Sequence, residues 1–306
     1  MSRLEEESKR VKKQPPCGIL NIHKPKGLTS RQVVNRIQRL AKPAKVGHAG
    51  TLDPMATGVL AVCVGRATRL VPYIQNYHKK YNAQFVLGKR SNTDDITGDV
   101  TEVPDFPEIR QSDIEKLLPQ FRGIIQQTPP QFSAIHIDGK RAYQLARQGE
   151  QVDIPSRDVE VHELEMTQFD FPEFTLEMKC GSGTYVRSIG RDIGELLTCG
   201  AVMTDLVRTE IGPYNIANAV LLDDITEENW IGFLLPPSTA VCTLPSYHLT
   251  NADCQQVIHG RPVLLKEKIT FPPKATVALF KEENQLAALA EYKPQENLLA
   301  PRVVFL

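Results

Sequence analysis

Runs of strand length, separated by turn residues, dominate this chain of 306 residues. Val59–Val64 is continuously apolar, 79–88 alternates between polar and apolar side chains, and 201–212 is a third strand-like run. Such patterns are typical of β-strands, and the Gly and Pro residues between them are typical of turns. Helical stripes are fewer, and the clearest lie in 30–41 and 183–197. The sequence therefore predicts an α+β protein with a mixed, largely antiparallel sheet and flanking helices.

The composition changes along the chain and suggests its division. Residues 1–16 are polar and charged and end in two prolines, so we expect a disordered basic tail. Residues 17–245 contain the interleaved strands and helices of one large domain. Within it, the Pro-rich stretch 126–150 is expected to leave the core and to end a short helix at Gly149. After a linker-like stretch, 246–306 is expected to form a small β-rich domain.

The formal net charge is zero, but the charges are unevenly distributed. Residues 1–92 contain 18 lysines and arginines against four acidic residues, and the other 214 residues contain 18 against 32. This asymmetry favours a surface that faces phosphates on a neutral molecule. The alternative is a solvated basic face together with a disordered tail.

Several classes of protein are disfavoured by the sequence. No apolar run is long enough to span a bilayer, and the N-terminus lacks the apolar core of a signal peptide, so we expect a cytoplasmic protein. The six cysteines form no C-x-x-C pair, and no histidine lies at metal-ligand spacing from them. Neither a disulfide framework nor a metal site is therefore expected.

A lone carboxylate stands inside the basic region, in the stretch VGHAGTLDPMATGVLAVCVG (46–65). Asp53 precedes a proline, which holds its backbone extended at a turn, and small neighbours allow a substrate to approach closely. The basic surroundings favour its ionised form, as a nucleophile or an electrostatic stabiliser requires. The alternative is an ordinary turn or cap residue. The loop follows the helix in 30–41, which Ser30 is expected to cap.

Further polar groups stand at the start of the second helix and in a strand. Tyr185 and Arg187 begin the helix, and a guanidinium fork could hold the Asp53 carboxylate through two parallel hydrogen bonds. Alone, the stretch would be read as a surface helix. Tyr81 follows two lysines, and it is either a core aromatic of a strand or a side chain that stacks on an extruded base.

Taken together, these stretches resemble a known family. ILNIHKPKGLTS, VGHAGTLDPMATGVLAV, KKYNAQFVLG, GSGTYVRSIGRDIG and LVRTEIGPY occur in this order and resemble the motif series of the TruB family of tRNA pseudouridine synthases. SAIHIDGKRAYQLARQGE, within the excursion at about 126–150, resembles the RNA-gripping thumb of bacterial members. CQQVIHGRPV and NLLAPRVVFL resemble the PUA-like RNA-binding module that ends many members, which implies a PUA-like domain over 246–306.

The resemblance implies an activity. Family members isomerise a uridine in the T-loop of tRNA, at position 55, to pseudouridine by base flipping and without a cofactor. The implied partner is the T-arm of tRNA. The thumb-like stretch favours a stand-alone monomeric enzyme that needs no membrane, guide RNA or protein partner.

The resemblance also assigns roles to residues. Asp53 matches the nucleophile, Tyr81 the tyrosine that stacks on the flipped uracil and is a candidate general base, and Arg187 the partner of the catalytic carboxylate. Whether Asp53 attacks ribose C1′, attacks uracil C6 or supports a glycal route stays open. Residues with an implied role in substrate binding are His48, which helps to keep the uridine extruded, Tyr185 and Leu206, which line the uracil pocket, and Lys24 and Pro25, which support the loop.

Two other classes of function and one variant remain as alternatives. A glycoside hydrolase also uses a nucleophilic carboxylate but needs a second acidic group, and none accompanies Asp53 in its motif. An inactive RNA-binding or RNA-folding protein would share the basic N-terminal half, although intact Asp53, Tyr81 and Arg187 count against it. A guide-RNA-dependent relative is the variant within the family.

Overall fold

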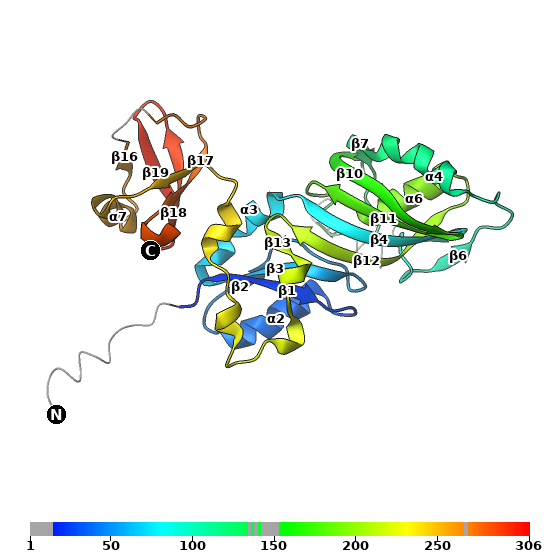
Figure 1. Cartoon of the computed structure of the whole chain (residues 1–306), viewed down its shortest axis with the longest axis horizontal. Coiled ribbons are helices and arrows are strands. Elements are labelled where there is room, and N and C mark those ends of the chain that lie inside the picture. The colour runs from blue at the N-terminus through cyan, green and yellow to red at the C-terminus, as the bar shows by residue number, and fades with distance from the viewer. Residues whose placement is uncertain (1–14, 134–135, 138–139, 142–152, 266–268) are drawn as a thin grey trace.

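A ten-stranded sheet forms the body of the molecule in a computed structural model, which describes residues 15–133, 136–137, 140–141, 153–265 and 269–306 (Figure 1). Among these residues, two of its strand pairs, β1 with β14 and β3 with β12, are parallel, and the others are antiparallel. The expected mixed, largely antiparallel sheet is thus confirmed. In order across the sheet, the strands are β14 (Val220–Leu221), β1 (Gly18–Lys24), β3 (Thr57–Val64), β12 (Ala201–Ile211), β4 (Lys79–Leu87), β11 (Glu173–Cys180), β10 (Arg157–Asp170) and β7 (Gly123–Gln127), with β13 (Tyr214–Asn215) beside β12 and β2 (Val46–His48) beside β3.

The centre of the sheet brings two sequence motifs together. Strand β3 is buried at every position after Thr57, as its apolar run predicts. Strands β4 and β12 pair antiparallel, with Tyr81 opposite Arg208 and Ala83 opposite Leu206. Because side chains alternate between the two faces of a strand, this register places Tyr81 and Leu206 close together.

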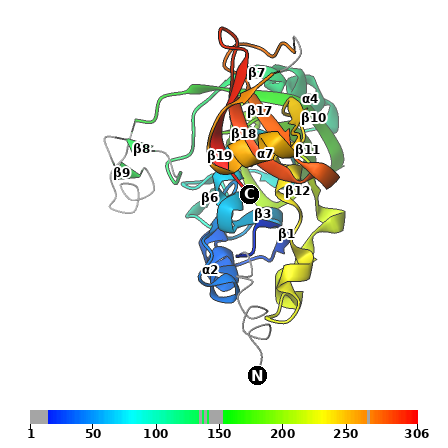
Figure 2. The same cartoon turned by 90° about the vertical axis from the view of Figure 1, so that its left-hand side faces the viewer.

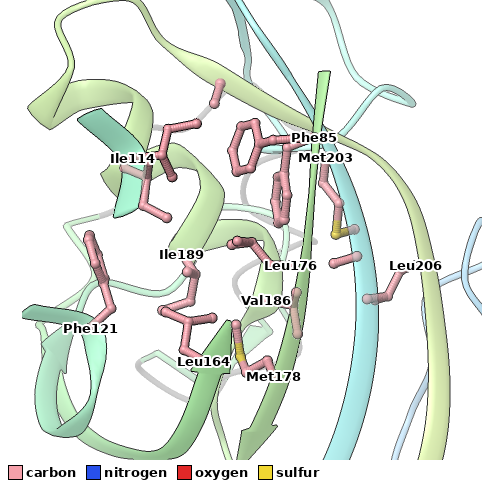
Figure 3. Packing of buried hydrophobic residues seen from close by; sticks show 14 of the residues in the cluster. Phe85, Ile114, Phe121, Leu164, Leu176, Met178, Val186, Ile189, Met203 and Leu206 are labelled. Carbon is pink, nitrogen blue, oxygen red and sulfur yellow. The ribbon is translucent and has the colours of Figure 1, made fainter. Parts of the chain in front are cut away.

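Helices cover the sheet and close two apolar cores. Helix α2 (Ser30–Ala41) packs its apolar stripe on β1 and β3, and helix α6 (Val186–Leu196) packs with α4 (Gln111–Leu117) in a second cluster. Figure 3 shows Val186 and Ile189 of α6 among the core side chains of the strands, including Leu176 and Leu206. Other short helices in the described chain, besides one in the second sheet described below, are α3 (Val71–Asn76) and the 3-10 turns η2 (Gly65–Leu70), η3 (Leu118–Phe121), η4 (Ile216–Asn218), η5 (Leu222–Asp224), η6 (Trp230–Phe233), η7 (Pro237–Val241) and η8 (Glu282–Asn284).

The N-cap of α2 differs from the expectation. Thr29, not Ser30, caps the helix: its backbone is extended, and its hydroxyl accepts a hydrogen bond from the Gln32 amide at 3.1 Å. The Gln32 side chain accepts one in return from the Thr29 amide at 2.8 Å, which completes a capping box. Ser30 is already helical, so its hydroxyl is free to bind elsewhere.

A second sheet of five strands follows the first, in the order β15-β17-β18-β19-β16. It also carries a helix that was not expected, α7 (Asn251–Ile258), which Thr250 caps. Ala278, Leu286 and Leu289 of this sheet share a buried cluster with Ile19 of the first. The expected division near residue 245 and the PUA-like character stay predictions. The strands are β15 (Ser246–His248), β17 (Thr276–Phe280), β18 (Leu286–Lys293), β19 (Leu298–Val304) and β16 (Val263–Leu264).

Two small hairpins lie outside the large sheets. Strands β5 (Lys89–Ser91) and β6 (Val100–Glu102) enclose the turn-rich 91–99 loop. Strands β8 (His136–Ile137) and β9 (Lys140–Arg141) pair with each other and stand apart from the body in Figure 2. Residues 1–14 of the expected disordered tail and the expected helix end at Gly149 lie outside the described residues. In the described part of the chain, no helix is long and apolar enough to cross a membrane.

Candidate active site

A cavity of about 460 Å³ opens where the Asp53 loop, β4, β12 and the start of α6 meet. This volume is within the usual range for sites that bind small organic groups. Five of the eight site residues predicted from the sequence line it, and the other three, Lys24, Pro25 and His48, do not. The lining residues of that set are Asp53, Tyr81, Tyr185, Arg187 and Leu206.

The loop that presents Asp53 is anchored on both sides of that residue. Before it, the Leu52 amide donates to the Ser30 hydroxyl at 2.9 Å, and this hydroxyl lies 3.1 Å from the Leu52 carbonyl. After it, the Pro54 carbonyl accepts from the Gly27 amide at 2.7 Å and from Lys24 Nζ at 3.3 Å. Because the backbone is hydrogen-bonded at both neighbours, Leu52 and Pro54, the backbone of Asp53 is held in a fixed position in the cavity wall.

Lys24 is buried entirely within this anchor. Its ammonium also donates to the carbonyls of Pro25 at 2.9 Å and Leu28 at 2.7 Å. Burial lowers the pKa of Lys24 to about 8, and the negative charge of Asp53 opposes that shift. These contacts tie Lys24 to the backbone of the loop, and it is not among the residues that line the cavity; its implied role in supporting the loop stays a prediction.

Arg187 holds two carboxylates rather than one. One terminal nitrogen lies 3.1 Å from Asp53 Oδ2, and the other lies 3.1 Å from Asp95 Oδ2. The prediction that Arg187 holds Asp53 through two parallel hydrogen bonds is therefore wrong. The second nitrogen is occupied because the 91–99 loop brings Asp95 and the Thr93 carbonyl, at 2.7 Å, against it. The Arg187 side chain is only 7% exposed, and its buried charge is neutralised and hydrogen-bonded by these contacts.

Asp95 is the functional candidate that the sequence did not reveal. Its side chain is 4% exposed, and one oxygen accepts from the Thr93 hydroxyl at 2.9 Å and from the Thr97 amide at 2.9 Å. An aspartate flanked by threonines in a turn is an ordinary turn pattern, so the sequence carried no distinguishing signal. Although a second carboxylate does lie near Asp53, its ion pair with Arg187 and its burial leave it unlike the general acid of a glycoside hydrolase.

The state of Asp53 depends on opposing influences. Burial raises the pKa of the Asp53 carboxyl; the Arg187 charge opposes this shift and the Asp95 charge adds to it. The side chain nevertheless keeps 37% of its surface exposed toward the cavity. The sequence suggested only the cations around Asp53, and the structure adds the burial and the second carboxylate that work against ionisation.

Arg208 is a second residue that the sequence analysis missed. It is 1% exposed, lines the cavity, and donates to the carbonyls of Val59 at 2.8 Å and Gly50 at 3.1 Å. Its position two residues after Leu206, on the same face of β12, was the available signal. It ties the Asp53 loop to the sheet.

The aromatic wall of the cavity consists of Tyr81 and Tyr185. Burial raises the pKa of the Tyr81 phenol, while the Arg208 guanidinium opposes the shift. Tyr185 precedes α6, and Gln127 accepts from its amide at 2.8 Å and donates to its carbonyl at 3.0 Å. Both rings therefore stand on well-anchored backbone. With Leu206 they give the cavity flat and apolar surfaces suited to a planar ring.

His48 lies outside the cavity, in strand β2. Burial lowers the pKa of the imidazole, and the positive charges of Arg31 and Arg208 add to that effect. Its Nδ1 is buried and has no hydrogen-bond partner among the residues that the structure describes. The imidazole is therefore favoured in its neutral form.

Comparisons with known proteins identify the family to which this chain is similar. The family profile described as TruB family pseudouridylate synthase (N terminal domain) matches residues 38–186, and tRNA pseudouridylate synthase B C-terminal domain matches 187–232. The tRNA pseudouridine synthase B of Syntrophomonas wolfei subsp. wolfei is 40% identical over 298 residues, which cover 94% of this chain and 98% of that protein. The protein of the same name from Synechococcus sp. (strain CC9311) is 40% identical over 95% of this chain and 98% of its own length. Among solved structures, one chain of a Cbf5-Nop10-Gar1 complex superposes with a TM-score of 0.71 at 26% identity, covering 94% of this chain and 85% of that one.

Proposed function

Because the chain belongs to the TruB family of pseudouridine synthases, we propose that it converts a uridine in the T-loop of tRNA, at position 55, to pseudouridine without a cofactor. The tRNA substrate is supported by the names of the curated relatives, each called tRNA pseudouridine synthase B. The observation that carries the proposal is the ion pair between Asp53 and Arg187 in a cavity that Tyr81 also lines. A tRNA substrate also supports a cytoplasmic location.

The reaction needs few groups from the protein. The bond from ribose C1′ to N1 breaks, the uracil turns, C5 bonds to C1′, and the proton that leaves C5 is balanced by one gained at N1. No atom is added or lost. In the proposal, ionised Asp53 is the nucleophile, and Arg187 orients its carboxylate through Oδ2. Attack at ribose C1′, attack at uracil C6 and support of a glycal route all use the same anionic group.

The aromatic wall is proposed to hold the flipped base. A base inside a stem-loop must leave its stack before chemistry, and an aromatic surface offsets the lost stacking. Tyr81 would stack on the uracil and is the candidate general base, whereas Tyr185 and Leu206 would line its pocket. His48 would pack into the RNA and so help to keep the target uridine extruded. Lys24 and Pro25 would support the loop that carries Asp53.

We further propose that the protein acts alone, as a monomer, with the second sheet as a PUA-like RNA-binding module. The competing view is that this protein needs partners to act, because a similar chain was solved in a Cbf5-Nop10-Gar1 complex. Incubating the purified protein with an unmodified tRNA transcript, and then mapping pseudouridine, separates the two. Modification at one T-loop uridine supports the proposal, and no modification without added protein or guide RNA contradicts it.

A further inference from the structure

A lysine without a counter-charge lies in the wall of the same cavity. Lys79 is 7% exposed and lines the cavity with Asp53. Its ammonium donates to the Ser182 hydroxyl at 2.9 Å and to the Gln75 carbonyl. Within the described ranges it forms no ion pair, and its third donor has no partner. A buried ammonium held only by neutral acceptors is unusual, because buried charges are normally paired.

The pKa of Lys79 reflects the same lack of a counter-charge. Burial, together with the positive charge of Arg208, lowers the pKa of Lys79 to about 8. No carboxylate contributes. An anion that entered the cavity would therefore find a cation whose charge is not already neutralised.

A second cation flanks the same stretch of wall. Arg157 also lines the cavity, donates to the Gly183 carbonyl, and lies with its guanidinium 5.3 Å from the centre of the Tyr185 ring. Its Nε is buried without a partner in the described part of the chain, and no described carboxylate pairs with it. Residues 181–184, a Gly-Ser-Gly-Thr stretch that also lines the cavity, lie between the two cations.

We propose that Lys79 and Arg157 form a binding subsite for a phosphodiester of the RNA strand next to the target uridine. The proposal rests on the proposed function, because it takes RNA as the ligand of the cavity. The phosphodiester is the only charged group of a uridine nucleotide within a strand. When Asp53 faces the ribose and Tyr81 the base, an adjacent phosphate supplies the anion that Lys79 lacks.

Direct binding measurements on three variants form the first part of the test. With an unmodified tRNA transcript, Lys79→Met should raise Kd roughly tenfold or more and reduce the log–log salt slope by about one contact. Lys79→Arg keeps the charge and should stay within a few-fold of the parent. Lys80→Met is the matched control, because Lys80 points to the opposite face of β4, is 43% exposed and pairs with Glu210. Equal Kd values for the two Met variants would overturn the proposal.

A neutralised phosphate identifies the ligand group itself. A T-arm stem-loop is made with a single methylphosphonate on the 5′ or the 3′ side of the target uridine. At one of these two positions, the methylphosphonate should weaken binding of the RNA to the parent protein. It should not weaken binding to Lys79→Met, because that variant has already lost the contact between Lys79 and the phosphate. Equal weakening of both proteins at both positions would overturn the proposal. If Lys79→Met does not fold, Arg157→Gln replaces it in the same binding measurements with the methylphosphonate stem-loops.

Pseudouridine mapping on the same transcript keeps the two proposals apart. If the parent binds with phosphate coupling to Lys79 but forms no pseudouridine, the phosphate subsite stands and the proposed function fails. If the parent forms pseudouridine without that coupling, the phosphate subsite alone fails.

Discussion

One guanidinium nitrogen of Arg187 lies 3.1 Å from Asp53 Oδ2, and the other lies 3.1 Å from Oδ2 of the buried Asp95. The arginine therefore links the loop that carries the proposed nucleophile to the 91–99 loop. A lysine, with a single ammonium group, cannot span both carboxylates in this planar arrangement. The position of Asp53 thus depends on a side chain that is itself oriented by a second loop.

The first prediction concerns this bridge. Removing one partner of a buried charge pair costs on the order of 3–5 kcal/mol, which corresponds to roughly two to four decades of rate if it falls on the transition state. Arg187→Met should lose about that much in single-turnover rate, and Arg187→Lys should lie between Met and the parent. The affinity for tRNA should change little in both variants. A normal rate with weaker binding and a shallower salt slope would instead make Arg187 a phosphate contact.

The second prediction concerns Asp95. Asp95→Asn keeps the shape but removes the charge that orients Arg187, so we expect a rate about five- to a hundred-and-fiftyfold lower, from a loss of roughly 1–3 kcal/mol. Binding of tRNA should be unchanged, which single-turnover kinetics and direct titration can separate. Asp99→Asn is the control, because Asp99 is exposed in the same loop and contacts Asn92 instead. Equal rates in the two variants would remove Asp95 from its positioning role.

The third prediction concerns pH. Burial raises the pKa of Asp53 above its ordinary value of 3.8, so its protonation begins at a higher pH than in an exposed aspartate. A protonated carboxyl is not a nucleophile, and the single-turnover rate should fall as the pH drops through the raised pKa. A rate that is flat down to the ordinary carboxyl pKa would contradict this.

The contribution of Asp53 to the free energy of unfolding should rise as the pH falls through the range in which the rate decreases. Because the folded state binds the Asp53 proton more readily than the unfolded state, protonation adds to the free energy of unfolding as the pH falls. Asp53→Asn lacks this contribution. The difference between the unfolding free energies of the parent and the variant should therefore depend on pH, and a constant difference would show that Asp53 has its ordinary pKa.

The fourth prediction compares two adjacent side chains. Ser30→Ala removes the hydroxyl that holds Leu52, and Thr29→Ala removes the cap of α2. Both should lower the free energy of unfolding by about 1 kcal/mol or somewhat more. Only Ser30→Ala should also slow the single-turnover reaction, because only it frees the loop that carries Asp53. Equal rates for the two variants would show that the Ser30 contact does not position Asp53.

Periodic features were predictable from the sequence. The apolar run of β3, the alternation of β4 and the stripe of α6 follow from simple periodicity, and they determine where the sheet and the helix form. Thr29 and Ser30 are both good cap residues by type, but the signal that favours Thr29 was in the sequence and was missed: Gln32 stands three residues after Thr29, at capping-box spacing. Helix α7 was missed because it is short, and only Val257 is buried among its residues.

The site was predictable where a motif marked it and not where contacts decide it. Asp53, Tyr81 and Arg187 stood out through the family resemblance, and the structure brings them to one cavity. Asp95 is 42 residues from Asp53 in the sequence, and its turn looks like any other turn. Its contact with Arg187 depends on how the loop after β4 folds against α6, which local sequence does not encode.

The most direct test of the proposed function measures Asp53 itself. Asp53→Ala and Asp53→Asn are mixed in excess with unmodified tRNA transcript, tRNA affinity is titrated in parallel, and pseudouridine is quantified over time. We expect no pseudouridine from either variant and affinity close to that of the parent, because binding rests on phosphates and base stacking rather than on one carboxylate. Measurable conversion by Asp53→Ala at saturating enzyme would contradict the nucleophile role.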